Sequence, residues 1–350
     1  MSAVAQLKGL TLANGWVVVE HLSQNPNGSG GTFSESYKVA RGEEVGFLKA
    51  FDFADAFKPG KNTTELIQIL TSAYNFEKAI LTHCRQRRLS NIVLAIDHGH
   101  VQVPGLGQIE GRVFYLIFEM AEGDVRCQLD ATNKFDPLWC MRALKDVSLG
   151  LWQIHQEMIA HQDVKPSNVL GFPDSGFKVS DFGRSSRRGY SVWYDANTIA
   201  GDQTYAPPEL MYGHLHSDFT PRRIGCDLYM LGNLAAFLFS GVNITSALLS
   251  KLDKQYHPHN WAGVYGDVLP YLQEAFTVVL EEQRNSIEED LIQDEAISLI
   301  KELCNPDLSL RGHPKGIGTH DQYSLQRYVT RLDLVSKRLA VSMRVRQKSA

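Results

Sequence analysis

The spacing of apolar residues in this chain of 350 residues changes character near residue 120. Before that point, strand-like segments occur at residues 16–20, 44–49, 92–96 and 113–118. One helical pattern, residues 63–88, separates the second of these segments from the third. Farther along, amphipathic helical patterns predominate. This order predicts an α+β protein with a small antiparallel β-rich lobe that carries one key helix, followed by a larger, mainly α-helical lobe.

The composition is that of an ordinary globular protein, with 43% hydrophobic and 21% charged residues. The formal net charge is −4, which gives no global reason to bind nucleic acid or an anionic membrane. We therefore expect no nucleic-acid partner.

The five cysteines form no Cys-x-x-Cys pair, which argues against a zinc site and favours free thiols in a reducing compartment. Residues 1–15 lack the features of a signal peptide, and the apolar residues 228–239 are too few to span a bilayer. These features predict a cytoplasmic protein without a membrane span.

The strongest chemical pattern is the segment His-Gln-Asp-Val-Lys-Pro-Ser-Asn at residues 161–168, followed by Asp-Phe-Gly at residues 181–183. Phosphoryl transfer depends mainly on positioning and on neutralising charge. Asp163 is a candidate base or orienting group for an acceptor hydroxyl, and Lys165 is a candidate cation for the transferring phosphoryl oxygens. Asn168 and Asp181 are oxygen ligands of the kind that Mg²⁺ prefers.

These two motifs resemble those of the eukaryotic-type protein kinase superfamily, and the resemblance extends from about Trp16 to Arg311. In that family the catalytic loop reads His-Arg-Asp, with Lys two residues and Asn five residues beyond the Asp. Tyrosine kinases usually lack this Lys, so Lys165 implies Ser/Thr specificity. The resemblance implies a two-lobed kinase fold, ATP and Mg²⁺ as cofactors, and protein substrates that offer Ser or Thr hydroxyls.

Two residues of the first lobe resemble the ion pair that holds the nucleotide phosphates in this family. Lys49 ends a strand-like segment and resembles the lysine that contacts the α- and β-phosphates. Glu77, within the helical pattern, resembles its glutamate partner. A lysine fixed in this way places a point charge beside the phosphates.

Other parts of the first lobe resemble the segments that bind adenine and cover the phosphates. Residues 118–121 resemble the hinge between lobes, so backbone groups near Glu119 and Ala121 would bind adenine. The flexible residues that would cover the phosphates are Gly28, Gly30 and Gly31.

The second lobe contains landmarks that resemble those of protein kinases rather than kinases of small molecules. Residues 201–209 resemble the end of the activation segment, and Arg311 resembles the distant arginine that pairs with Glu209. Asp227 resembles the buried acid that holds the backbone of the catalytic loop.

Four positions depart from the family pattern. The Gly-rich loop has serines where two of the family glycines would fall, at Ser29 and Ser34. Phe47 stands where the family usually has a small alanine against adenine. Gln162 replaces the arginine that, in many kinases, binds a phosphate on the activation segment, so we expect activity without phosphorylation of that segment.

The patterns and the resemblance together predict three regions. Residues 14–120 form the N-lobe, residues 121–312 the C-lobe, and residues 313–350 a basic amphipathic tail. In the tail, the apolar residues that share one helical face are Leu325, Tyr328, Leu332, Val335 and Leu339. This face would pack on the second lobe, or alternatively dock a partner or lie on a membrane surface.

The sequence thus favours a Mg²⁺-dependent Ser/Thr protein kinase. A pseudokinase that binds nucleotide or acts as a scaffold is the alternative that Phe47 and the loop serines suggest. A kinase of a small metabolite is a third possibility, against which Lys165 and residues 201–209 argue.

Overall fold

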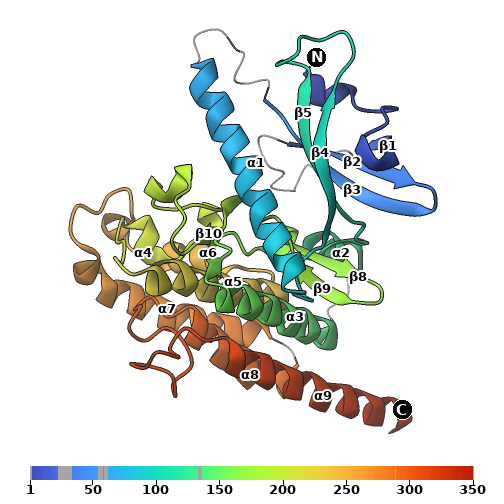
Figure 1. The fold of residues 1–350 in the computed structure, drawn as a ribbon. Coiled ribbons are helices and arrows are strands. Elements are labelled where there is room, and N and C mark those ends of the chain that lie inside the picture. Colours follow the sequence, from blue (N-terminus) through green and yellow to red (C-terminus); the bar gives the residue numbers. More distant parts are fainter. Residues whose placement is uncertain are drawn as a thin grey trace. The chain divides into compact units, whose positions relative to one another are not determined.

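The computed structural model describes residues 2–22, 34–53, 58, 62–132, 136–287 and 289–349. The chain forms two compact units, Met1–Glu122 and Gly123–Ala350. The first unit contains an antiparallel sheet with one long helix, and the second is mainly helical (Figure 1). The predicted α+β fold class is therefore confirmed.

The first unit is built on a five-stranded antiparallel sheet in the order β1-β2-β3-β5-β4. The strands are β1 (Val17–Leu22), β2 (Ser34–Arg41), β3 (Glu44–Phe51), β4 (Ala95–Gln102) and β5 (Arg112–Glu119). The strand-like segment predicted at residues 92–96 corresponds to β4, and the prediction is wrong in its bounds. Gly99 continues the strand because it passes the ring of Tyr115, where an added Cβ would lie 2.7 Å from the Tyr115 hydroxyl.

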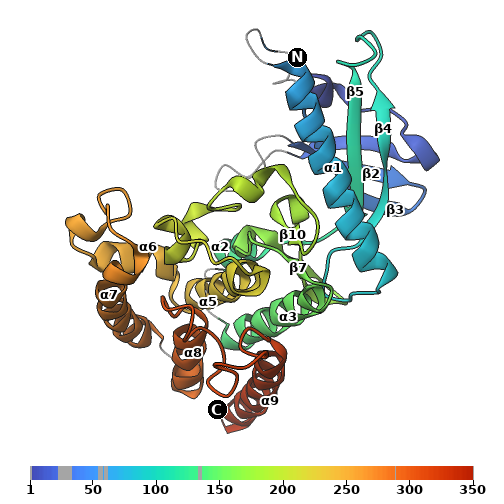
Figure 2. The same cartoon turned by 60° about the vertical axis from the view of Figure 1, so that its left-hand side comes forward.

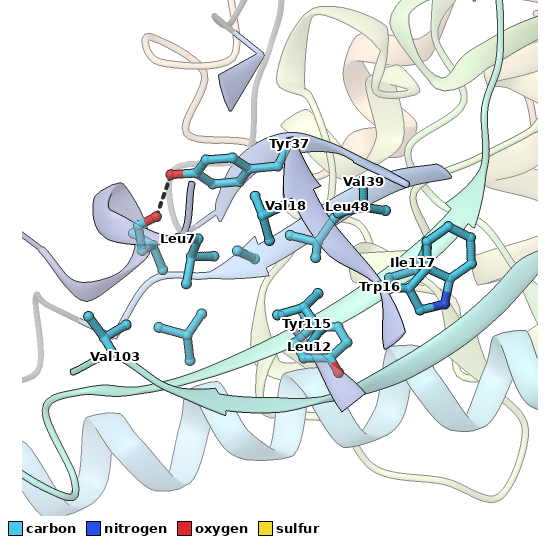
Figure 3. Close-up of a cluster of buried hydrophobic side chains, with 13 residues drawn as sticks. Leu7, Leu12, Trp16, Val18, Tyr37, Val39, Leu48, Val103, Tyr115 and Ile117 are labelled. Carbon is cyan, nitrogen blue, oxygen red and sulfur yellow. Dashed lines mark hydrogen bonds between the residues drawn. The ribbon is translucent and has the colours of Figure 1, made fainter. Parts of the chain in front are cut away.

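One face of this sheet is covered by the N-terminal segment, which contains the short helices η1 (Ala3–Gln6) and η2 (Ala13–Gly15). Val4, Leu7, Leu12 and Trp16 are buried there against sheet residues such as Leu48 (Figure 3). The hydroxyl of Tyr37 donates a hydrogen bond to the carbonyl of Val4, which anchors the segment to β2. The N-terminal residues are thus part of the core of this unit.

Helix α1 (Thr63–Gln86) packs on the opposite face of the same sheet. The side chain of Asn62 caps it by accepting a hydrogen bond from the amide of Glu65. The ring of Tyr74 lies 5.2 Å from that of Phe51 on β3 and 5.1 Å from that of Phe114 on β5. Because strand side chains alternate between faces, Lys49 and Phe51 both face α1.

The second unit is built around the helices α3 (Pro137–Gln156) and α5 (Gly225–Ser240). Its other α-helices, in the described residues, are α2 (Val125–Thr132), α4 (Pro208–Met211), α6 (Ile244–Lys251), α7 (Tyr265–Ser286), α8 (Asp290–Leu303) and α9 (Gln326–Ser349). Its strands are β6 (Gly123–Asp124), β7 (Ile159–Ala160), β8 (Val169–Phe172), β9 (Gly176–Val179) and β10 (Ser186–Arg187). Helix α5 is buried on nearly every side, which makes it a rigid support for the loops that contact it.

Helix α9 packs against α3, as Figure 2 shows. Of the predicted apolar face, Leu325, Tyr328, Leu332 and Leu339 are buried and Val335 is half-buried, so this face is used within the unit. The prediction that this face packs on the second lobe is confirmed.

Across the described residues, no single helix is long and apolar enough to cross a membrane. By length and composition alone, one pair of helices bent by 88°, Thr220–Ser240 with Ile244–Lys251, passes the same test.

Replacing Leu7 with alanine should lower the free energy of unfolding of the first unit by about 2–5 kcal/mol, because it leaves a cavity in a fully buried cluster. Urea denaturation would measure the change. The matched control is Lys8→Ala, whose side chain is exposed and should change stability by less than about 0.5 kcal/mol. Equal, small effects for the two variants would show that the N-terminal segment does not belong to the core.

Candidate active site

The loop between β7 and β8 brings three of the predicted site residues together. The ammonium of Lys165 lies 3.1 Å from Oδ2 of Asp163. The Nδ2 of Asn168 donates to the same Oδ2 (3.0 Å) and to the backbone carbonyl of Asp163 (2.8 Å). All three side chains are buried, and the short helix η4 (Pro166–Asn168) sets the spacing between Lys165 and Asn168.

The orientation of Asn168 decides which of its atoms could bind a cation. Because Nδ2 is held by Asp163, the carbonyl Oδ1 of the amide is turned away from that residue. An amide oxygen together with a carboxylate fits Mg²⁺, which usually takes one or two protein oxygens and completes its shell with phosphates and water.

Asp181 is the nearby carboxylate that the sequence pairs with Asn168. It has a left-handed backbone (φ 61°) just before the short helix η5 (Phe182–Arg184), and its carboxylate accepts from the amide of Gly183 (3.4 Å). The next residue, Phe182, is buried with its ring 5.0 Å from that of His161. This contact fixes the backbone beside Asp181 against the catalytic loop.

Asp202 is part of the site, but the sequence did not identify it. Its amide donates to Oδ1 of Asp163 (2.8 Å), and its carboxylate lies 3.5 Å from the ammonium of Lys165. Gly201 makes this approach possible, because an added Cβ would lie 2.3 Å from the carbonyl of Gln162. The Gly-Asp pair at the start of residues 201–209 was the available sign of this close approach.

The electrostatics of the site act on the two carboxylates in opposite directions. Burial raises the pKa of Asp163, the Lys165 ammonium partly offsets that rise, and the charge of Asp181 adds to it. For Asp202, burial also raises the pKa. Hydrogen bonds from the hydroxyl and amide of Thr204, together with the charge of Lys165, outweigh this effect and leave the pKa of Asp202 below its ordinary value. Asp163 is therefore the better proton acceptor of the two.

Asp227 at the start of α5 binds the backbone of the catalytic loop. Its carboxylate accepts from the amides of His161 (2.7 Å) and Gln162 (2.7 Å) and contacts Nε2 of His155 (2.8 Å). The carboxylate is fully buried, so each of these bonds replaces water that it has lost. The predicted role of this residue is confirmed.

The predicted pair of Glu209 and Arg311 is also confirmed. The guanidinium of Arg311 donates two hydrogen bonds to the carboxylate of Glu209, at 2.7 and 2.8 Å, and both residues are buried. Further bonds from Arg311 to the carbonyls of Asn305 (3.0 Å) and Gly225 (3.2 Å) complete its set of partners. This pair anchors the segment that ends at α4.

In the first unit, the ammonium of Lys49 lies 2.9 and 3.1 Å from the two carboxylate oxygens of Glu77. Glu77 is buried, so the pair fixes the lysine at the face of β3 that α1 covers. Phe47 is on the same face, with its ring 6.4 Å from that of Phe118.

The remaining predicted residues of the first unit are Glu119, Ala121 and the glycines. Glu119 ends β5 opposite Gly46, and its carboxylate accepts from the amide of Leu94 (2.6 Å). Ala121 lies two residues farther along and is half-buried. Gly28, Gly30 and Gly31 lie outside the described residues.

Comparison with known proteins gives the chain a family. The model of the protein kinase domain matches residues 72–322. The chain is 26% identical over 159 residues to the serine/threonine-protein kinase PrkC of Bacillus subtilis (45% of this chain, 24% of that protein). It is 24% identical over 240 residues to mouse Aurora kinase B (66% and 65%), and 29% identical over 146 residues to PknA of Mycobacterium tuberculosis (41% and 32%). The matches span less than two thirds of the length of each of these relatives.

Replacing Lys165 with methionine should raise the pKa of Asp163 further, because it removes the cation that lies 3.1 Å away. Asp181→Asn should lower that pKa, because it removes a like charge. A pH titration of the Asp163 carboxyl carbon by NMR, in protein free of divalent cations, would measure both shifts. As control, Lys251→Met removes an exposed lysine that pairs with Glu282 and should leave the titration unchanged. A downward shift in Lys165→Met would contradict this description of the site.

Proposed function

The chain belongs to the protein kinase domain family, and on that premise we propose that it transfers the γ-phosphate of ATP to Ser or Thr hydroxyls of protein substrates. The observation that carries the proposal is the arrangement around Asp163. Its carboxylate accepts a hydrogen bond from the amide of Asp202 and lies beside Lys165 and Asn168, and the charge of Asp181 acts on it. A base, a cation and two metal ligands are the groups that phosphoryl transfer requires.

In this proposal Asp163 orients the acceptor hydroxyl and takes its proton. As the hydroxyl oxygen bonds to the γ-phosphorus, the bond to the bridging oxygen of ADP breaks, and the proton goes to a carboxylate oxygen of Asp163. Lys165 offsets the negative charge of the phosphoryl oxygens, and its position between Asp163 and Asp202 keeps it oriented. Since protonated Asp163 cannot act as base, the raised pKa moves the acidic loss of activity to a higher pH than for an ordinary aspartate.

The cofactors in this proposal are ATP and Mg²⁺. Asn168, through Oδ1, and Asp181 would hold the metal, which neutralises phosphate charge when bound. Lys49, held by Glu77, would contact the α- and β-phosphates. Backbone groups of Glu119 and Ala121 would bind adenine.

Lys165 supports Ser/Thr rather than Tyr specificity, and the relatives PrkC and PknA are named serine/threonine-protein kinases. We place the protein in the cytoplasm, because none of the five cysteines forms a disulfide and four are buried. A docking partner of the tail would have to bind the exposed side of α9, where Leu334, Val341 and Val345 lie.

Phe47 favours one second candidate, a pseudokinase that acts as a nucleotide-binding or scaffolding module. Its ring is on the same face of β3 as Lys49 and beside Phe118, so it occupies space that a smaller side chain would leave to adenine. The two candidates differ in whether phosphate is transferred.

Incubation with labelled ATP, Mg²⁺ and a generic protein substrate tests both candidates. We expect label on Ser and Thr, and a loss of about 10²- to 10⁴-fold in rate for Asp163→Asn, because the proton acceptor is removed. The matched control is Asp253→Asn, which makes the same change at an exposed position and should keep full activity.

ATP binding, measured in parallel by calorimetry, separates the outcomes. Nucleotide binding without transfer by the unaltered protein would favour the pseudokinase. Label confined to small molecules would instead favour a metabolite kinase, and either result would refute the protein kinase assignment.

A further inference from the structure

Gln162 stands where many kinases have a phosphate-binding arginine, and its side chain is fully engaged. The amide Nε2 donates to the carbonyl of Arg184 (3.0 Å), and Oε1 accepts from Nη1 of Arg223 (2.5 Å). Only 3% of Gln162 is exposed. The catalytic loop thus contacts an arginine that comes from a different part of the chain.

Arg223 links the catalytic loop to the segment from Asp181 to Glu209, here called the activation segment. Its other nitrogen, Nη2, donates to Oδ1 of Asp195 (3.1 Å) and to the carbonyl of the same residue (3.4 Å). Arg222 adds a bond to that carbonyl (3.0 Å). Both arginines belong to the π-helical turn η8 (Thr220–Ile224) that leads into α5, so they are attached to the most buried helix of the unit.

Contacts within the activation segment also fix the residues around Asp195. Asp195 lies in the short helix η6 (Trp193–Ala196), and its carboxylate accepts from the amide of Val192 (2.8 Å). The neighbouring Tyr194 is buried, and its hydroxyl donates to the carbonyl of Ser185. The guanidinium of Arg184 lies over the rings of Trp193 (5.7 Å) and Tyr194 (5.9 Å).

We propose that Asp195 and Arg223 are positioning residues that tie the activation segment to the catalytic loop through Gln162. The carboxylate of Asp195 would then hold the activation segment in place, as a bound phosphate does in many kinases. Arg223 is buried and needs an anion, and Asp195 supplies it without modification. Two of the segment hydroxyls that could otherwise be phosphorylated, those of Ser185 and Ser186, belong to buried residues. The kinetic consequence of this tie rests on the proposed kinase function, but the tie itself does not.

Amide hydrogen exchange of residues 190–200 tests the tie without any assay of activity. Asp195→Asn keeps the shape of the side chain and removes its charge, so exchange in this segment should become about tenfold faster or more. Asp195→Glu, which restores the carboxylate, should recover most of the protection. The matched control is Asp294→Asn, which removes the carboxylate from the exposed pair with Arg284 and should leave this segment unchanged.

Kinetics then test whether the tie positions the catalytic machinery. Asp195→Asn should lower kcat for a protein substrate about tenfold with the Kd for ATP unchanged, and Asp195→Glu should restore kcat. Arg223→Lys keeps the charge but loses the planar fork, and should resemble Asp195→Asn. Phosphatase treatment of the unaltered protein should leave kcat as it was.

Unchanged exchange in Asp195→Asn, or loss of activity on phosphatase treatment, would overturn the proposal. If the unaltered protein transfers no phosphate, the proposed function fails, while the exchange measurement still decides whether the tie exists.

Discussion

The candidate site depends on the hydrogen bonds that the fully buried carboxylate of Asp227 accepts from the catalytic loop. Its two oxygens accept hydrogen bonds from the amides of His161 and Gln162. Asp227 belongs to helix α5, which the second unit covers on nearly every side. Gln162 has a left-handed backbone (φ 63°), a conformation that lets consecutive amides point at one anion. The loop that carries Asp163 therefore takes its shape from the core.

The periodicity of the sequence predicted four of the five strands of the sheet, and the helix among them, in the right order, because most strands bury one face and most helices one stripe. It gave no strand for residues 34–41, which form β2. β4 continues past residue 97 because Gly99 allows a close approach to Tyr115. The role of residues 3–16 in covering the sheet was also missed, since Val4, Leu7 and Leu12 are too irregularly spaced to form a recognisable element.

The site was predictable where a motif holds its residues close in sequence or where family resemblance joins distant ones. Resemblance joined Glu209 to Arg311, which are 102 positions apart. Asp202 was missed because only the folded chain brings its amide to Asp163. The contact of Asp195 with Arg223 was missed for a related reason, since Gln162 was noted only for what it lacks. In the structure, Gln162 accepts a hydrogen bond from Arg223. Because Arg223 is buried away from water, its guanidinium needs a carboxylate, and Asp195 supplies it.

In the proposed function, the carboxylate of Asp181 and the amide oxygen of Asn168 form the protein half of a magnesium–phosphate site beside Asp163. A crystal structure of the protein with Mg²⁺ and a non-hydrolysable ATP analogue tests this most directly. We predict a metal ion at about 2.0–2.1 Å from an oxygen of each residue, with phosphate oxygens and water in its remaining positions. A bound nucleotide whose metal touches neither residue, or an Asn168 with its nitrogen turned toward the metal, would contradict it.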